Sequence, residues 1–501
     1  MSDAAAGTSP MMTLGQALQW LPGGRLVGDP ATPVLRVHTD TRTLAEGDLF
    51  VALKGERFDA NDFLAEARAK GAIAAIAERG LEAAGLAGIE VDDTLAALAS
   101  LAAGWRSQFD IPLIAVTGSN GKTTVTQMIA AVLRVACGEH SLATVGNFNN
   151  EIGVPLTLLR LRERHRRSVV ELGMNHPGEI LRLAEMARPS IALVNNAQRE
   201  HQEFMAGVDA VAVENGSVFA VLPENGTAVF PFGDAFTSLW NETAREGATR
   251  RCLSFGEQSD ADIALVDARW EQDAWRLHAR TPLGDVVTTL RIAGRHNVVN
   301  ALAAIACSMA AGVSIEKIAE GLARFEPVKG RSRASRIAVA GGAAITLVDD
   351  TYNANPDSVR AAIDVLASLP GPRLLVLGDM GEVGDRGPEF HAEVGAWARE
   401  RGIEMLYALG DASASSVQAF AQGSDAPDDS SAAARSFDGR HFNDIDTLDA
   451  AVLAQLPRLA SVLVKGSRFM RMERVVQAVI AAADAASIPS EQQAKEAGHA
   501  E

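Results

Sequence analysis

The stretch LIAVTGSNGKTTV, residues 113 to 125, constrains the possible fold more than any other part of the chain. An apolar run leads into a turn of small and polar residues, and the helical pattern VTQMIAAVLRVA begins at its end. At the start of a helix, free backbone N–H groups and the helix dipole favour a bound phosphate, and a lysine there can reach the outer phosphates. We predict that this turn binds the phosphates of ATP, with Lys122 as its cation and Thr123 as a Mg²⁺ ligand. The predicted phosphate loop comprises Thr117, Gly118, Ser119, Asn120, Gly121, Lys122, Thr123 and Thr124.

The spacing of this loop departs from the usual P-loop pattern, which would require a glycine at Val116. A polar turn with an exposed lysine is therefore a competing interpretation. Between Gly71 and Glu316, however, Lys122 is the only lysine of the chain, and the other long basic side chains of this stretch are arginines. Because this one lysine was kept, we favour a functional role and predict an ATP site.

Composition excludes several classes of function. The net charge is −17 and the basic residues are scattered, which argues against a nucleic-acid-binding surface. The three cysteines lie far apart without the C-x-x-C spacing of a metal cluster, as expected in a reducing compartment. The chain has neither a signal-peptide pattern nor an apolar run of about 18 residues, so we expect a cytoplasmic protein without a membrane span. We also expect it to act as a monomer.

The length of 501 residues predicts about three domains. Strand and helix patterns alternate along most of the chain, which predicts an α/β fold with parallel sheets. We expect a small α/β domain over residues 1–110, a central P-loop domain with a parallel sheet over 111–325, and a C-terminal Rossmann-like α/β domain over 326–484. The polar residues 485–501 are expected to form a disordered tail.

Two polar side chains follow strands of the central domain. The predicted strand in SVVELGMN ends at Glu171, and the predicted strand IALVNN leads into a loop that carries His201. In open α/β sheets, ligands bind beyond the carboxyl ends of the strands, so both side chains should lie near Lys122. A carboxylate and an imidazole near ATP phosphates suggest a metal site shared by protein and nucleotide. A loop histidine without a ligand role is the alternative for His201.

Three further sites have weaker signals. Thr41 and Arg42 could bind a phosphate or a uracil edge, or could form an ordinary capped turn. Asn297 and Asn300 lie in the first turn of an Ala-rich helix, where amides could bind adenine or simply cap the helix. Arg331, in the turn PVKGRSR, marks an expected hinge with a phosphate-facing arginine.

The predicted strands of the C-terminal domain also end in polar or small residues. Asp350, Gly378, Gly410 and Lys465 each lie at such an end. Because the carboxyl ends of parallel strands meet at one edge of a sheet, they predict a second ligand-facing edge.

These motifs together resemble the Mur ligases, ATP-dependent enzymes that form amide bonds in peptidoglycan synthesis. The shortened loop TGSNGKTT is a shared signature of that family and accounts for the unusual P-loop spacing. The resemblance covers nearly the whole chain, in the segments DTRTLAEGDLFVALKGERFDANDF, GNFNNEIGVPLTLL, ELGMNHPGEI, DDTYNANPDS, LGDMGEVG and LVKGSRFMRME.

The resemblance implies an activity, its substrates and the roles of matching residues. It implies that ATP activates a carboxylate as an acyl phosphate, that UDP-N-acetylmuramoyl-tripeptide is the acyl donor and that D-Ala-D-Ala is the amine. Thr41 and Arg42 would bind the UDP-sugar end, Glu171 and His201 would serve Mg²⁺, and Arg331 would lie near the γ-phosphate. Asn297 and Asn300 would lie near adenine and Asp350 near the ribose. The remaining implied substrate residues are Asn147, Asn149, Asn150, Tyr352, Asn353, Asn355, Lys465 and Ser467.

One segment departs from the family pattern. Many Mur ligases carry a carbamylated lysine in the central domain that bridges a second Mg²⁺, whereas the corresponding segment AVAVENGSVF has no lysine. We expect Glu214 to supply the negative charge directly. The alternative is that water and substrate phosphate hold this metal more weakly.

Other functions remain compatible with the sequence. A related ligase could add a single amino acid or extend a folate with glutamate, and the bare residues do not select the dipeptide. A nucleotide-switch ATPase would hydrolyse ATP without an amine and a carboxylate. A UDP-sugar-binding module with a degenerate ATP site is disfavoured, because the loop, the metal residues and the arginine occur together.

Overall fold

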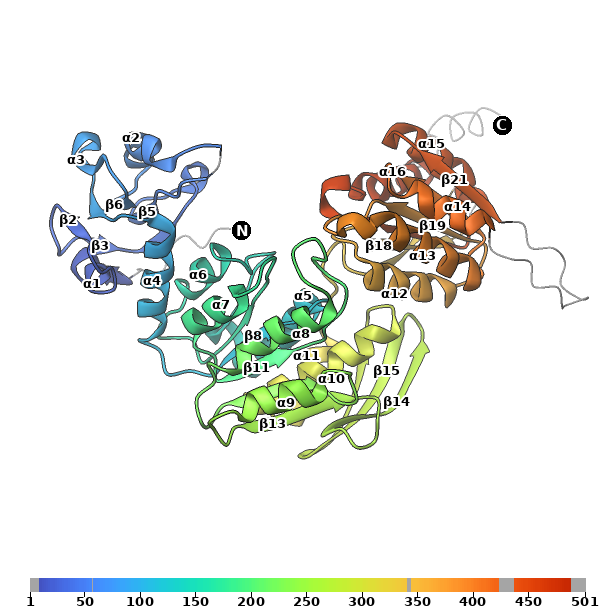
Figure 1. The fold of residues 1–501 in the computed structure, drawn as a ribbon, viewed down its shortest axis with the longest axis horizontal. Coiled ribbons are helices and arrows are strands. Elements are labelled where there is room, and N and C mark those ends of the chain that lie inside the picture. Colours follow the sequence, from blue (N-terminus) through green and yellow to red (C-terminus); the bar gives the residue numbers. More distant parts are fainter. Residues whose placement is uncertain (1–8, 56, 340–343, 423–436, 488–501) are drawn as a thin grey trace, which may run out of the picture.

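The structure is a computed structural model that describes residues 9–55, 57–339, 344–422 and 437–487. Three α/β parts follow one another along the chain, and Figure 1 shows the first and the last on the same side of the middle one. The predicted α/β class with parallel sheets is confirmed. The last helix, α16 (Glu473–Ser487), extends three residues into the predicted tail, and residues 488–501 lie outside the described part of the chain.

The first part contains a five-stranded sheet in the order β2-β7-β6-β5-β4 and a two-stranded pair, β1-β3. Strands β4 to β7 run parallel and β2 is antiparallel to β7. Strands β5 and β6 are buried along their whole length, as expected for a parallel sheet covered on both faces. The elements are β1 (Met12–Thr13), α1 (Leu14–Gln19), β2 (Arg25–Val27), β3 (Pro33–Val34), β4 (Arg36–His38), β5 (Asp48–Val51), α2 (Leu64–Ala69), β6 (Ala74–Ala77), α3 (Leu81–Ala84), β7 (Ala87–Glu90) and α4 (Thr94–Arg106).

Helix α4 attaches the first part to the second. The indole N–H of Trp105 donates to the carbonyl oxygen of Leu161 at 3.1 Å, and the Arg106 guanidinium donates to the carbonyl of Ala187 at 2.9 Å. The apolar face of α4 belongs to the same hydrophobic core as the central helices α6 and α7. This continuous core fixes the helix against the central part.

The central sheet has nine strands in the order β16-β15-β14-β13-β12-β11-β8-β10-β9. Strands β9 to β13 and β8 run parallel, and β14 to β16 form antiparallel pairs at one end. The elements are β8 (Leu113–Thr117), α5 (Lys122–Cys137), β9 (Ser141–Ala143), α6 (Gly153–Leu158), β10 (Arg167–Glu171), α7 (Glu179–Ala187), β11 (Ile191–Val194), α8 (Val208–Gly216), β12 (Thr227–Pro231), α9 (Thr237–Arg245), β13 (Arg251–Gly256), β14 (Ile263–Glu271), β15 (Ala274–Thr281), β16 (Gly284–Leu290), α10 (Arg295–Ala310) and α11 (Ile315–Ala323).

Alternation along β8 explains why this strand lies in the interior of the sheet. Leu113 and Ala115 pack into the core with α4, α6 and α7, whereas Ile114 and Val116 pack against α5, α10 and α11. Both faces of the strand are therefore buried under helices. The predicted phosphate loop begins at the carboxyl end of this strand and leads into α5.

The third part is a six-stranded sheet in the order β17-β18-β22-β19-β20-β21, in which only β17 is antiparallel to its neighbour. Separate hydrophobic cores cover its two faces. The register pairs Asp350 with Lys465, so the polar strand ends lie side by side. The elements are β17 (Arg333–Ala338), β18 (Ala344–Asp350), α12 (Pro356–Ala367), β19 (Arg373–Gly378), α13 (Gly387–Glu400), β20 (Met405–Leu409), α14 (Ala414–Gln422), β21 (Asp438–Phe442), α15 (Ile445–Gln455), β22 (Ser461–Lys465) and α16.

Candidate active site

A cavity of about 1080 Å³ lies where the three parts meet. Its walls come from the start of α4, from the phosphate loop and neighbouring strand ends of the central part, and from the carboxyl edge of the C-terminal sheet. The register places Glu171 beside Val116 and Val194 beside Thr117, so β10 and β11 end on either side of the loop. Several predicted residues lie at the carboxyl ends of these parallel strands and therefore line one cavity.

The phosphate loop requires glycine at two positions. Gly118 has a φ of 128° and Gly121 a φ of 83°, both in the region that side chains disfavour. A Cβ at Gly118 would lie 3.0 Å from the Cβ of Asn195, and one at Gly121 would lie 2.6 Å from Oδ1 of Asn300. The loop backbone thus packs directly on these two asparagines.

The segment after β11, residues 195–201, holds the phosphate loop in place and is called the bridging loop below. The N–H of Ser119 donates to the carbonyl oxygen of Asn196 at 3.1 Å, and the N–H of Asn120 donates to Oδ1 of Asn196 at 2.8 Å. Nδ2 of Asn120 also donates to Oε1 of Gln198 at 2.6 Å. These bonds pre-organise the turn that precedes α5.

The ammonium group of Lys122 lies over the loop and lines the cavity. It donates to the carbonyl oxygens of Gly118 at 2.5 Å and Ser119 at 3.0 Å, and to the carboxylate of Glu200 at 3.1 Å. The side chain of Glu200 is 7% exposed and one of its oxygens has no hydrogen-bond partner. The lysine is therefore held at the mouth of the loop, where a phosphate oxygen can replace a carbonyl as its acceptor.

Glu171 and Thr123 form a buried polar pair beside Lys122. Oγ1 of Thr123 donates to Oε1 of Glu171 at 2.9 Å, and Nδ2 of Asn149 donates to the same oxygen at 2.8 Å. The second oxygen of Glu171 is buried without a hydrogen-bond partner. Burying an unpaired carboxylate oxygen is costly, so this arrangement suits a cation that also binds the nucleotide.

His201 lies with acidic residues of two domains. Its Nδ1 is 2.6 Å from a carboxylate oxygen of Glu382 in the C-terminal part, and its Nε2 is 3.8 Å from Glu200. The hydrogen bond to His201 lowers the pKa of Glu382 below its usual value. Within the described ranges, no hydrogen bond or ion pair joins His201 to Glu171, and no cluster of three or more His, Cys, Asp or Glu side chains is arranged as a metal site.

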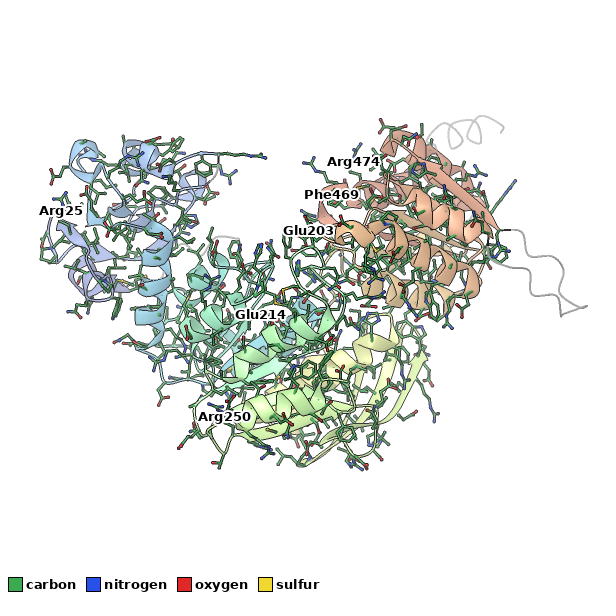
Figure 2. The ribbon with its side chains drawn as sticks, in the orientation of Figure 1. Arg25, Glu203, Glu214, Arg250, Phe469 and Arg474 are labelled. Carbon is green, nitrogen blue, oxygen red and sulfur yellow. The ribbon has the colours of Figure 1, made fainter. Side chains whose placement is uncertain are left out.

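The metal role predicted for Glu214 is not supported by its position, and we withdraw it. Its two carboxylate oxygens accept the backbone N–H groups of Gly178 at 2.8 Å and Ile180 at 2.9 Å, at the start of α7. Glu214 is not among the residues that line the cavity, and Figure 2 labels it on the central part at α8. It caps a neighbouring helix because two free N–H groups there need acceptors.

Replacing Glu214 with alanine is therefore expected to lower stability without changing the response to Mg²⁺. Two buried N–H groups lose their acceptor, which costs about 1–3 kcal/mol in the free energy of unfolding. Thermal unfolding measures this change, and Glu185→Ala on the exposed face of α7 is the matched control. A weaker dependence of nucleotide binding on Mg²⁺ in Glu214→Ala would restore the original prediction.

Asn297 and Asn300 lie on the cavity wall but are almost fully buried. Nδ2 of Asn297 donates to the carbonyl of Ala293 at 2.7 Å, and Nδ2 of Asn300 donates to Oδ1 of Asn297 at 2.9 Å. Oδ1 of Asn300 in turn accepts from Nδ2 of Asn195 at 2.9 Å. The chain of amides connects α10 to the strand end below the phosphate loop.

The C-terminal wall contains Arg331, Tyr352 and a buried ion pair. Cζ of Arg331 lies 3.9 Å from the centre of the Tyr352 ring. Nζ of Lys465 donates to Asp350 at 2.6 Å and to the carbonyl of Asn353 at 2.8 Å. Burial alone would favour the neutral acid, but the nearby ammonium holds the pKa of Asp350 below its usual value.

Other predicted residues of this wall and of the central turn also take defined positions. Oγ of Ser467 accepts the N–H of Gly381 at 2.8 Å, and Oδ1 of Asn150 accepts the N–H of Gly153 at 2.9 Å at the start of α6. Nδ2 of Asn355 donates to Oδ1 of Asn120 at 2.9 Å, which joins the C-terminal part to the phosphate loop. Asn147, Asn149, Asn150, Asn353 and Asn355 line the cavity.

Thr41 and Arg42 lie apart from this cavity. They form a short 3-10 turn of the first part (Thr41–Thr43), in which Arg42 is exposed and paired with Asp40 at 2.6 Å. Neither residue lines the cavity. Their assignment to the UDP-sugar end stays a prediction.

Apart from His201, sequence reasoning missed the residues of the bridging loop and their partners. Arg199 donates to Asp357 at 2.6 Å and to Glu393 at 2.7 Å, both in the C-terminal part. The polar run QREH in the loop after the predicted strand IALVNN was the available signal, and it does not reveal which distant carboxylates these residues contact. Glu200 and Glu382 escaped attention for the same reason.

Comparisons with known proteins show the family to which the chain is similar. Models of the Mur ligase family match three regions: the catalytic domain at residues 34–106, the middle domain at 116–308 and the glutamate ligase domain at 333–468. The UDP-N-acetylmuramoyl-tripeptide–D-alanyl-D-alanine ligase of Escherichia coli K12 is 40% identical over 88% of this chain and 93% of its own length. The enzyme of that name from Haemophilus influenzae is 35% identical over 92% of this chain and 96% of its own length.

Solved structures give the same relationship. A crystal structure of MurF from Acinetobacter baumannii has a TM-score of 0.83, with 34% identity over 95% of this chain and all of that chain. MurF ligase from Thermotoga maritima in complex with ADP has a TM-score of 0.75, with 26% identity over 90% of this chain and 98% of that chain. Among the described residues, no helix is long and apolar enough to cross a membrane. The chain belongs to the Mur ligase family of ATP-dependent ligases that form amide bonds.

Proposed function

We propose that this protein joins D-alanyl-D-alanine to UDP-N-acetylmuramoyl-tripeptide in peptidoglycan precursor synthesis, with ATP and through an acyl phosphate. The relatives of that name, with 30–40% identity over most of the chain, support this choice of substrates. We further propose that it acts in the cytoplasm as a monomer. Thr41 and Arg42 are proposed for the UDP-sugar end.

The chemistry explains why such a site needs positioned charge and no covalent nucleophile. A carboxylate is a poor acyl donor because oxide is a poor leaving group, so it must first accept the γ-phosphate. The amine then attacks the acyl carbon, and phosphate leaves from the tetrahedral intermediate. Phosphoryl transfer of this kind depends on alignment and charge neutralisation, which Lys122 and Arg331 would supply.

One observation carries the proposal. The phosphate loop and the C-terminal wall line the same cavity and touch through Asn120 and Asn355, at 2.9 Å. A nucleotide on the loop, an acyl group in the cavity and an amine on the C-terminal wall would then meet without leaving the cavity. Domain closure would exclude water, which otherwise hydrolyses the acyl phosphate.

The residues beside the loop fit Mg²⁺. The hydroxyl of Thr123 and the unpartnered oxygen of Glu171 are hard oxygen donors, and Mg²⁺ usually takes one or two carboxylates together with phosphates and water. When bound, the ion would neutralise charge on the phosphates. We propose these two residues as its protein ligands and keep His201 as a candidate for a second ion.

In Glu171→Gln, the factor by which Mg²⁺ increases the affinity for ADP is expected to fall at least about tenfold, because the neutral amide is a poor Mg²⁺ ligand. The amide oxygen can still accept from Thr123 and Asn149, so the fold should be retained. Calorimetric titration of ADP at several Mg²⁺ concentrations measures the effect independently of turnover. An unchanged Mg²⁺ dependence would remove Glu171 from the metal site.

Phosphate release in the presence of ATP tests the function. Purified protein is given UDP-N-acetylmuramoyl-tripeptide with D-Ala-D-Ala, D-Ala or L-amino acids, and a folate with glutamate serves as a separate arm. We expect rapid release only with the tripeptide and D-Ala-D-Ala together, and a product of matching mass. Release with ATP alone would indicate a nucleotide switch, and turnover with a single amino acid would indicate another ligase of the family.

A further inference from the structure

The incoming dipeptide is a zwitterion, and its two ends need different surroundings. Its amine must be free beside the activated carbonyl, whereas its carboxylate lies about 7 Å away when the dipeptide is extended. An unpaired carboxylate in a closed cavity is costly, so a cation should meet it there. The residues assigned above leave this cation unidentified.

Two of the cations that line the cavity already form short ion pairs with carboxylates of the protein. Lys465 is 4% exposed and bound to Asp350 and to the carbonyl of Asn353. Arg199 is held by two carboxylates of the C-terminal part. Neither group can turn to a new anion without breaking short, charged hydrogen bonds to partly buried carboxylates, which is unfavourable.

Two further cations belong to other substrates. Lys122 lies over the phosphate loop, on the nucleotide side of the cavity. Arg182 is on α7 of the central part, which packs against α4 at the junction with the first part. The wall that carries Asn353 and Lys465 therefore needs a cation of its own.

Arg468 meets this requirement. It follows β22 on the C-terminal wall and lines the cavity, and its side chain is 69% exposed. Its ion pair with the half-buried Glu473 is a single contact of 3.4 Å, weaker than the contacts of 2.6–2.7 Å that hold Arg199. A substrate carboxylate can therefore replace Glu473 at small cost.

Two arginines lie close enough together to contact a single dipeptide. Cζ of Arg331 lies 3.9 Å and Cζ of Arg468 lies 5.9 Å from the centre of the Tyr352 ring, so they are at most about 10 Å apart, against about 7 Å between the ends of an extended dipeptide. With Arg331 at the γ-phosphate, which becomes the leaving group next to the acyl carbon that the amine attacks, the other end of the dipeptide can reach Arg468. We infer that Arg468, stacked near Tyr352, binds the carboxylate of the incoming dipeptide and makes the enzyme select a free C-terminus. This inference rests on the proposed function.

The test compares D-Ala-D-Ala with its C-terminal amide in the wild type and in Arg468→Gln. Losing a charged hydrogen-bond partner should raise the KM for D-Ala-D-Ala about tenfold to a hundredfold, while kcat and the KM values for ATP and the UDP-tripeptide stay within about twofold. The wild type should prefer the free acid over the amide by a similar factor. In Arg468→Gln this preference should disappear, because the uncharged glutamine side chain does not distinguish a C-terminal carboxylate from a C-terminal amide.

Arg474→Gln is the matched control. Arg474 also has a 3.4 Å ion pair at the surface, with Asp446, but does not line the cavity. Figure 2 labels it near Phe469, the neighbour of Arg468, at the same edge of the C-terminal part. It should keep the wild-type KM and the preference for the acid. A second variant, Glu473→Gln, frees Arg468 from its partner and should lower the KM for D-Ala-D-Ala about twofold or more.

The outcomes separate the inference from the proposed function. If the wild type couples D-Ala-D-Ala but Arg468→Gln keeps its KM and its preference for the acid, the inference is overturned and the function stands. A rise in the KM for ATP instead of the dipeptide would also overturn it, by assigning Arg468 to the nucleotide. If the wild type does not couple D-Ala-D-Ala at all, the proposed function fails and the inference fails with it.

Discussion

Lys122→Ala is expected to lower turnover by about two to three orders of magnitude while the protein stays folded. The ammonium group sits over the phosphate loop, within 3.1 Å of two loop carbonyls and of Glu200. Its positive charge would stabilise charge that develops on the transferred phosphoryl group, and alanine cannot replace it. Steady-state phosphate release with all three substrates measures the loss.

The controls for this variant separate catalysis from stability. Lys317→Ala removes an exposed lysine on α11, away from the cavity, and should leave turnover unchanged. Because Lys122→Ala leaves the buried Glu200 without its cation, the double variant with Glu200→Gln should recover stability but not turnover. Near-normal turnover in Lys122→Ala would contradict the mechanism.

Arg199→Ala is expected to lower turnover about tenfold to a hundredfold by weakening the docking of the C-terminal part. Arg199 donates both to Asp357 at the start of α12 and to Glu393 on α13. Its neighbours in the bridging loop bind the phosphate loop, so this single arginine couples the C-terminal wall to the position of the phosphates. Losing hydrogen bonds between charged groups costs about 1.5–3 kcal/mol, which corresponds to that range.

Small-angle scattering and turnover together check this prediction. The variant should be more extended in solution, and Arg199→Lys should restore it only in part because lysine lacks the planar fork. Arg440→Ala is the control, since Arg440 pairs with Asp438 on β21, the edge strand of the C-terminal sheet. Unchanged scattering and turnover in Arg199→Ala would exclude a docking role.

The contact between Arg199 and Glu393 should stabilise the docking of the C-terminal part equally at all pH values near neutrality. The hydrogen bonds from Arg199 lower the pKa of Glu393 to about 2, against an ordinary value of 4.5. A carboxyl whose pKa is lowered on docking contributes fully above its ordinary pKa, and the contribution is lost as the pH falls through about 2. The contribution of the Arg199–Glu393 contact to docking should therefore not change between about pH 5 and pH 8.

Parts of the site followed from local rules. The glycine turn before α5 and the rule that ligands lie beyond the carboxyl ends of parallel strands pointed to Lys122 and Glu171, and both line the same cavity. These rules work because backbone geometry and strand direction depend on residues close in sequence. The partners of His201 did not follow, because Glu382 lies in another domain.

Glu214 illustrates the limit of reasoning by analogy in sequence. Because the carbamylated lysine of the family is missing, a nearby carboxylate was expected to supply the negative charge of the carbamate. In the fold, Glu214 instead caps α7, where its carboxylate accepts two backbone N–H groups, and it does not line the cavity. Sequence spacing on α8 does not reveal which neighbouring helix start needs an acceptor.

The sequence by itself determined the α/β class, the phosphate loop and the family, because hydrophobic periodicity, glycine turns and long motifs are local properties of the chain. Only the tertiary structure decided that Arg199 joins the bridging loop to α12 and α13, and that Arg331 and Arg468 both lie near one tyrosine ring. Such contacts join residues far apart in sequence. Their geometry depends on how the sheets pack and how the domains dock, which no local pattern records.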